Sequence, residues 1–249
     1  MISLCLQCCP HDHVAAMELA LLICDIQHAH PVKGAEFFLI YRKDTAPQVP
    51  RYFNDLAKQV FDRAEARVAR NYADGWPYGS NMLAGSAFIE MTLLAREKLC
   101  LNSGFLLFEP DCIPLSLDWL EQLSREWDTV QAEGKQAFGH WHQQGDSDTL
   151  HLNGNAVFET SFFDKHPTMI IGTGTMGWDY WFKDHLIPIS RDSNLIHQHY
   201  NRHGLSPDEF RVLGKNGVRP ALFHGCKTPD GRQSAREVLL KEPKTVESP

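Results

Sequence analysis

The chain has 249 residues, of which 43% are hydrophobic and 22% charged, and its formal net charge is −7. This length and composition indicate an ordinary globular protein with a large core, and the negative charge disfavours broad binding to a nucleic-acid backbone. The longest uncharged runs hold too many polar, glycine or histidine residues for a membrane span, and we read no basic signal segment at the start.

The N-terminal half alternates predicted strands with predicted helices, judged from the spacing of apolar residues. In chain order we expect a strand over 2–9, a helix over 13–29, a strand over 35–41, an amphipathic helix over 51–71, a turn-rich loop over 74–81, a helix over 82–98 and a buried strand over 101–108. This alternation predicts a mainly parallel α/β sheet flanked by helices. Such sheets bind ligands beyond the carboxyl ends of their strands.

The C-terminal half is less regular. We expect a helix capped by Ser116, strands over 136–141 and 149–158, helices over 178–186 and 192–203, a late strand over 219–223 and a frayed polar tail over 241–249.

Seven cysteines, an odd number at scattered positions, favour reduced thiols and an intracellular location. We therefore expect a cytoplasmic protein, or one of the host cytoplasm if it is viral. The N-terminal group Cys5, Cys8, Cys9, His11 and His13 resembles part of a zinc site, but no second pair of ligands follows nearby. We interpret these cysteines as small hydrophobic residues of a strand.

Two carboxylates stand one residue apart at the end of the predicted strand 101–108. Glu109 and Asp111 flank Pro110, which stiffens the turn, and hard oxygen ligands in this position can hold a divalent cation. The alternative is a strand end with solvated charges. Pro10 and the segment 42–44 also follow predicted strands, so three polar loops converge on one edge and favour the cation site.

A histidine near the C-terminus can complete that site. His224 follows the late strand, and its neutral imidazole is a suitable third ligand for Mn²⁺ beside two carboxylates. Gly225 allows the backbone to approach a phosphate closely, and Lys227 can neutralise a diphosphate. The alternative is a surface histidine beside a turn.

Two further segments carry polar groups suited to a sugar. Asn153 and Asn155 offer paired amide donors and acceptors for hydroxyl groups. A hairpin turn is the alternative, but apolar residues continue through 156–158 and favour a site on a strand. The glycine-rich loop 172–177 leads to Trp178 and Asp179, where Asp179 is either a site residue or a helix cap.

In this order along the chain, the features resemble a nucleotide-sugar-dependent glycosyltransferase of the GT-A fold over roughly residues 2–227. The turn 109–111 is similar to the DxD element of that superfamily, with Glu in its first place. The run from His224 to Lys227 is similar to the late His-Gly-Lys element of several retaining members, glycogenin-like enzymes among them. The longer form of that element continues with Pro-Trp, whereas Thr228 and Pro229 follow here.

The resemblance implies a Rossmann-related, mixed and mainly parallel central sheet in a single domain over 1–240, with a flexible tail over 241–249. Residues 1–110 would form the nucleotide-binding half and 111–240 the acceptor and metal half. The implied cofactor is Mn²⁺ or Mg²⁺, held by Glu109, Asp111 and His224.

The resemblance also implies where the substrates bind. The residues expected at the nucleoside-diphosphate sugar donor are Cys9, Pro10, Arg42, Asp44, Gly79, Ser80, Asn81, Glu109, Pro110, Asp111, Gly225 and Lys227. Those expected at the acceptor are His151, Asn153, Trp178 and Asp179, and those expected in catalysis are Asp179, Asn153 and Asn155. An Asp179 base favours inversion of the anomeric centre, whereas the His-Gly-Lys element favours retention.

The implied reaction moves a sugar to a hydroxyl group of a glycan, with a hydroxymethylated DNA base as the alternative acceptor. Two other classes of protein stay open: a nucleotidyltransferase acting on a sugar phosphate, and a non-catalytic nucleotide- or sugar-binding module. No glycine-rich basic loop follows the first strand to hold a triphosphate, which disfavours the former. We interpret the group His197, His199 and His203 as chance proximity rather than a metal site. The sequence does not determine the oligomeric state.

Overall fold

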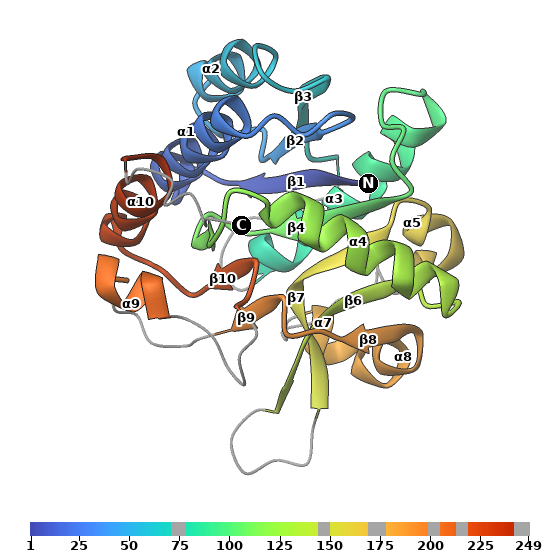
Figure 1. Ribbon diagram of the computed structural model, residues 1–249. Coiled ribbons are helices and arrows are strands. Elements are labelled where there is room, and N and C mark those ends of the chain that lie inside the picture. Colours follow the sequence, from blue (N-terminus) through green and yellow to red (C-terminus); the bar gives the residue numbers. More distant parts are fainter. Residues whose placement is uncertain (71–77, 144–149, 169–177, 199–204, 213–218, 242–249) are drawn as a thin grey trace.

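A seven-stranded mixed sheet forms the centre of the molecule (Figure 1). The computed structural model describes residues 1–70, 78–143, 150–168, 178–198, 205–212 and 219–241, and the side chains within these ranges except those of 78–84, 178 and 181. The order of the strands is β3-β2-β1-β4-β7-β6-β8. The strands are β1 Ile2–Cys8, β2 Glu36–Tyr41, β3 Arg63–Val68, β4 Gly104–Phe108, β6 Ala137–Gln143, β7 Leu150–Glu159 and β8 Ser190–Asp192.

The first four strands in chain order are parallel and form one half of this sheet. β1 pairs with β2 and with β4, and β2 pairs with β3. On the other side β7 is antiparallel to both β4 and β6, and β8 is parallel to β6. The prediction of a mixed, mainly parallel sheet flanked by helices is therefore confirmed.

Helices cover both faces of the sheet, which is why β1 and β4 are buried along their whole length. α1 His13–Ala29, α2 Gln48–Ala57, α4 Trp119–Ala132 and α10 Pro229–Arg236 pack with one face, and α3 Tyr78–Arg96, α5 Phe162–Lys165 and α8 Lys183–Ile189 pack with the other. The other helices of the described residues are α7 Trp178–Trp181, α9 Pro207–Val212 and the π-helix η1 Glu237–Lys241. Side chains of β1 alternate between the two cores, with Leu4 in one and Cys5 in the other.

A second, three-stranded sheet brings together three short segments that are far apart in the sequence. Its order is β5-β10-β9, with β5 at Cys112–Pro114, β9 at Ile196–Gln198 and β10 at Leu222–His224. β10 is antiparallel to β5 and parallel to β9. In register, His224 stands opposite Cys112 on one side and Gln198 on the other.

The predicted helix over 51–71 is wrong in its second half. α2 ends at Ala57, and Arg63–Val68 forms the edge strand β3. The alternation of charged residues with Ala64, Ala66 and Val68 satisfies a strand as well as a helix, and six paired positions on β2 decide between them. Long-range pairing thus overrides good local helix formers.

Three other predictions differ from the structure or lie outside the described residues. The prediction of a helix over 192–203 is wrong for residues 192–198, which contribute to the short strands β8 and β9. The residue before α4 is Asp118 rather than Ser116. The tail over 242–249 lies outside the described residues. Among the helices of the described ranges, none is both long and apolar enough to cross a bilayer.

Candidate functional site

The carboxyl ends of β1, β2 and β4 are adjacent, since these three strands are neighbours in the sheet. The backbone N–H of Arg42 donates to the carbonyl of Cys8 over 3.1 Å, which ties the end of β2 to the end of β1. Cys9 and Pro10 follow at once on β1. Of the residues predicted at the donor, Cys9, Pro10 and Arg42 thus lie at the carboxyl ends of these strands, close to where the acidic turn begins after β4.

Arg42 forms an ion pair at the carboxyl end of β2. Its guanidinium is buried and donates twice to the carboxylate of Asp44, over 3.1 Å from Nε and 2.7 Å from Nη2. A two-bond fork of this kind fixes the plane of both groups. Arg42 and Asp44, both predicted at the donor, form one preorganised pair.

The acidic turn 109–111 is clamped from both sides. The carbonyl of Asp111 accepts the backbone N–H groups of Gly225 and Cys226 over 3.3 and 3.0 Å. Gly225 has a φ of +117°, a conformation that side chains with a Cβ rarely adopt. From the other side, the buried guanidinium of Arg232 donates to the carbonyl of Pro110 over 3.4 Å.

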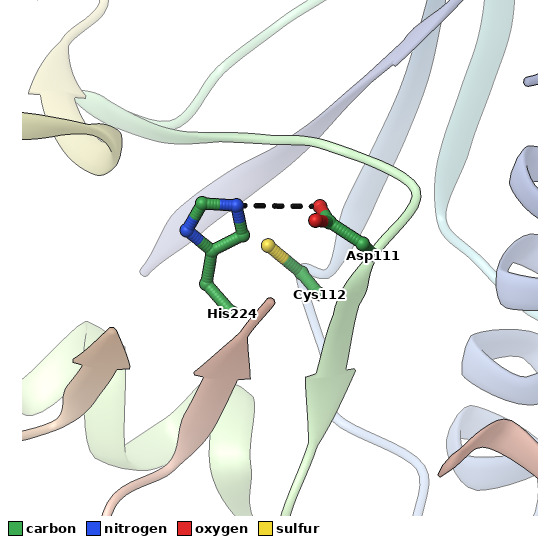
Figure 2. A group of neighbouring side chains, drawn as sticks. All are labelled: Asp111, Cys112 and His224. Carbon is green, nitrogen blue, oxygen red and sulfur yellow. Dashed lines mark ion pairs between the residues drawn. The ribbon is translucent and has the colours of Figure 1, made fainter. Parts of the chain in front are cut away.

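The structure brings the three predicted metal ligands together. Nε2 of His224 lies 3.3 Å from Oε2 of Glu109 and 3.3 Å from Oδ1 of Asp111. Figure 2 shows His224 on β10 facing Asp111 and Cys112 at the start of β5. Asp111 and His224 are buried, whereas the side chain of Glu109 is half-exposed.

The charges of these groups depend on one another. Burial would raise the pKa of Asp111, but pairing with His224 and Lys227 outweighs it and holds that pKa well below its ordinary value. Burial would lower the pKa of His224, but Asp111 and Glu109 outweigh it and raise that pKa to about 9. Without a cation, the imidazole is therefore a cation itself at neutral pH.

Lys227 adds a second positive charge to the same carboxylate. Its Nζ lies 2.5 Å from Oδ2 of Asp111. Although these ion pairs surround it, neither buried oxygen of Asp111 takes part in a hydrogen bond with good geometry among the described residues. A buried carboxylate in this state has lone pairs to offer to a metal ion.

Cys112 is a member of this group that sequence reasoning did not assign. One ligand atom from each of Asp111, Cys112 and His224 lies within 4.8 Å of the others. Burial keeps the pKa of the Cys112 thiol far above its ordinary value, and the thiol donates to Oδ1 of Asn155 over 3.2 Å. The 4.8 Å group contains Cys112 and not Glu109, but the cysteine sulfur is a soft ligand that points at an amide. The donor set that suits a hard cation is therefore Glu109, Asp111 and His224.

Asn155 connects the strand β7 to this cluster. Its Oδ1 accepts the backbone N–H of Glu109 over 2.7 Å, and its Nδ2 lies 3.4 Å from Oε2 of the same residue. Asn153 Oδ1 in turn accepts the backbone N–H of Asn155 over 2.9 Å. The two amides lie within a strand rather than at a hairpin turn, and Asn155 is committed to protein partners.

Asp179 lies next to the same strand. Its Oδ2 accepts the backbone N–H of Gly154 and its Oδ1 that of Tyr180, both over 3.0 Å. Burial, together with the charge of Glu109, raises the pKa of Asp179 to about 6 despite these hydrogen bonds. The carboxyl group is therefore more than a helix cap, because it also fixes β7 between the two asparagines.

His151 ends the row of polar residues on β7. His151, Asn153 and Asn155 are alternate residues of β7 and all three are buried, and the register of β7 with β6 shifts between Leu152 and Ala156. His151 packs edge-on against His142 and Tyr180, with ring centroids 5.4 and 5.6 Å away. Its buried Nδ1 has no hydrogen-bond partner in the described part of the chain.

Some predicted residues cannot be compared with the structure. Gly79, Ser80 and Asn81 lie in the first turn of α3 and Trp178 opens α7, but their side chains are outside the described residues. The loop 172–177 and the histidines at 199 and 203 also lie outside.

Comparison with known proteins identifies similar folds but no matching family. No protein-family model matches the chain, and no curated protein matches its sequence. Mouse xyloside xylosyltransferase 1 in its apo form superposes with a TM-score of 0.56 at 9% identity, over 92% of this chain and 99% of that one. Galactosyltransferase LgtC in complex with donor and acceptor sugar analogs gives 0.58 at 11% identity, over 98% of each chain.

A glycosyltransferase involved in glycosylation of the major capsid of PBCV-1 gives 0.53 at 10% identity, over 95% of this chain and 98% of that one. At these identities the likeness concerns the fold. The chain has the architecture of GT-A-type glycosyltransferases, and the predicted fold class is confirmed.

Proposed function

We propose that this protein is a metal-dependent glycosyltransferase that moves a sugar from a nucleoside-diphosphate sugar to a hydroxyl group. The observation that supports it best is the convergence of Glu109, Asp111 and His224, with Lys227 beside them, in a chain with a glycosyltransferase fold. This edge of the sheet is where α/β folds bind nucleotides.

The donor set fits Mn²⁺ or Mg²⁺. Two carboxylates and an imidazole are ligands that Mn²⁺ accepts. The oxygens of Asp111 have ion-pair partners but no hydrogen-bond partner among the described residues, and they would coordinate the metal in place of those partners. When bound, a divalent cation supplies positive charge beside the oxygens of the diphosphate leaving group. The residues that would hold it are Glu109, Asp111 and His224.

Lys227 has a second task in this proposal. It is paired with Asp111 and half-exposed, so it can turn from that carboxylate towards a diphosphate once a cation neutralises the site. An ammonium group there stabilises the charge that develops as the glycosidic bond breaks. Gly225 leaves room for the phosphates against the backbone.

In this proposal residues 1–110 would bind the nucleotide end of the donor, with Cys9, Pro10, the Arg42–Asp44 pair and the segment 79–81 as its contacts. The remaining part of the domain, 111–240, supplies the metal ligands and the acceptor side. The chain would act as one unit over 1–240, because Asp111 at the junction serves both halves.

The acceptor end lies further along β7. From Asn155 at the cation site, β7 runs back through Asn153 to His151. Asn153 and the neighbouring Asp179 would orient the acceptor hydroxyl, with His151 and Trp178 beyond it. Asp179 would be ionised above about pH 6 and able to accept the proton of that hydroxyl.

A glycan is the acceptor that suits this row of residues. Amides and imidazoles recognise sugar hydroxyls, and the ring of Tyr180 beside His151 offers an aromatic surface. A modified DNA base is the other acceptor considered, and the net charge of −7 disfavours it.

The experiment is a thermal-shift screen of nucleoside diphosphates and their sugar conjugates, each with and without Mn²⁺. Stabilisation that requires both nucleotide and metal is expected, because a ligand that binds only the folded state raises its melting temperature. The protein is then incubated with each stabilising nucleotide sugar and an acceptor mixture, and in a parallel reaction with nucleoside triphosphates and a sugar phosphate. Release of nucleoside diphosphate supports transfer, release of pyrophosphate from a triphosphate identifies a nucleotidyltransferase, and binding without turnover identifies a binding module.

A further inference from the structure

We infer that Gln198 is a positioning residue that holds His224 in the tautomer and orientation required of a metal ligand. The inference rests on the proposed function, because it concerns the same cation site. We assign Gln198 no contact with a substrate, and its effect is exerted only through His224.

The strand pairing places Gln198 directly beside His224. β9 and β10 are parallel, and these two residues are register partners. Oε1 of Gln198 is hydrogen-bonded to Nδ1 of His224. The other ring nitrogen, Nε2, faces Glu109 and Asp111.

This arrangement decides which nitrogen is available. A neutral imidazole has one N–H and one lone pair, and the lone pair must point at the metal. With a cation bound between Nε2 and the carboxylates, Nε2 must be deprotonated, so the one remaining ring proton is on Nδ1, and Nδ1–H needs an acceptor. The amide oxygen of Gln198 is that acceptor, which is the usual support for a ligating histidine.

Asn155 cannot take over this role, although its amide also lies against the imidazole. Its Nδ2 is 3.3 Å from Nδ1 and 3.2 Å from Nε2 of His224, so it lies between the two nitrogens. Its Oδ1 already accepts the N–H of Glu109 and the thiol of Cys112. Within the described residues, the only oxygen hydrogen-bonded to Nδ1 is therefore that of Gln198.

The test is the affinity of the protein for Mn²⁺ in the absence of nucleotide. The electron paramagnetic resonance signal of the free ion measures how much Mn²⁺ stays unbound. Gln198→Leu removes the acceptor and is expected to weaken binding by about 10- to 100-fold, the usual loss for such a partner. Gln198→Glu keeps an oxygen at the same position and is expected to restore tight binding. Gln122→Leu, which removes a part-buried glutamine amide from α4, is the matched control and should leave the affinity unchanged.

Wild-type affinity in Gln198→Leu overturns the inference, and so does failure of Gln198→Glu to restore binding. If Gln198→Leu does not fold, Gln198→Met replaces it. Absence of Mn²⁺ binding in the wild type instead refutes the proposed function.

A second measurement needs no variant. In the wild-type protein saturated with Mg²⁺, the ¹⁵N shifts of the His224 ring should show a proton on Nδ1 and none on Nε2. The opposite tautomer overturns the inference even if Mn²⁺ binds tightly.

Discussion

Raising the pH should destabilise the metal-free protein through His224. The folded state holds the pKa of this imidazole at about 9, above its ordinary value of 6.5, because Asp111 and Glu109 surround it. A group with a raised pKa contributes its stability fully below about pH 6.5 and loses it as the pH rises through about 9. At 1.36 kcal/mol per pKa unit the whole contribution is about 3 kcal/mol, and roughly 2 kcal/mol of it disappears between about pH 7 and pH 9.

The assay is urea unfolding in the presence of a chelator, with wild type and His224→Gln compared at each pH. Glutamine does not titrate, so other ionisable groups affect both proteins alike and cancel in the difference. The free energies of unfolding of the two proteins should converge by about 2 kcal/mol as the pH rises over this range. A difference that stays constant would refute the assigned pairing of His224 with the carboxylates.

Binding of Mn²⁺ should show the opposite trend. Nε2 must lose its proton before it can ligate, so the cation competes with a proton at neutral pH. The dissociation constant should fall by up to about tenfold per pH unit below pH 9 and level off above it. Isothermal titration in buffers of different ionisation enthalpy measures the proton released, and release of none would contradict the competition.

The other predictions concern the acidic turn, the acceptor side and the core. Asp111→Asn should keep the far-UV circular dichroism of the wild type but weaken Mn²⁺ binding by more than about 100-fold, the upper limit for a residue that only supports a ligand. Wild-type affinity in this variant would remove Asp111 from the ligand set. Asp179→Asn should lower kcat by about 10²- to 10⁴-fold with little change in donor affinity. The wild-type rate should fall below about pH 6, where Asp179 becomes protonated, and the variant should lack this fall. An unchanged pH profile would exclude Asp179 as the base. Gly104→Ala should cost about 1–3 kcal/mol in urea unfolding, because a Cβ there would lie 2.5 Å from the ring of Trp127, and wild-type stability would contradict this packing.

Local pattern alone predicts most of the long elements with a regular apolar spacing. The helix over 13–29 and the first two strands were found because their apolar residues repeat over several turns or alternations. The acidic turn was recognised because two carboxylates directly follow a fully apolar strand, so Glu109 and Asp111 were assigned to one edge of a parallel sheet from order along the chain.

Tertiary structure decided what short or ambiguous segments do. Arg63–Val68 suits a helix or a strand, and pairing with β2 selects the strand. β9 is only three residues long, so its neighbours in sequence gave no sign that Gln198 would stand beside His224. The site joins residues more than a hundred positions apart through hydrogen bonds between strands, and such pairing leaves no periodic trace in either segment.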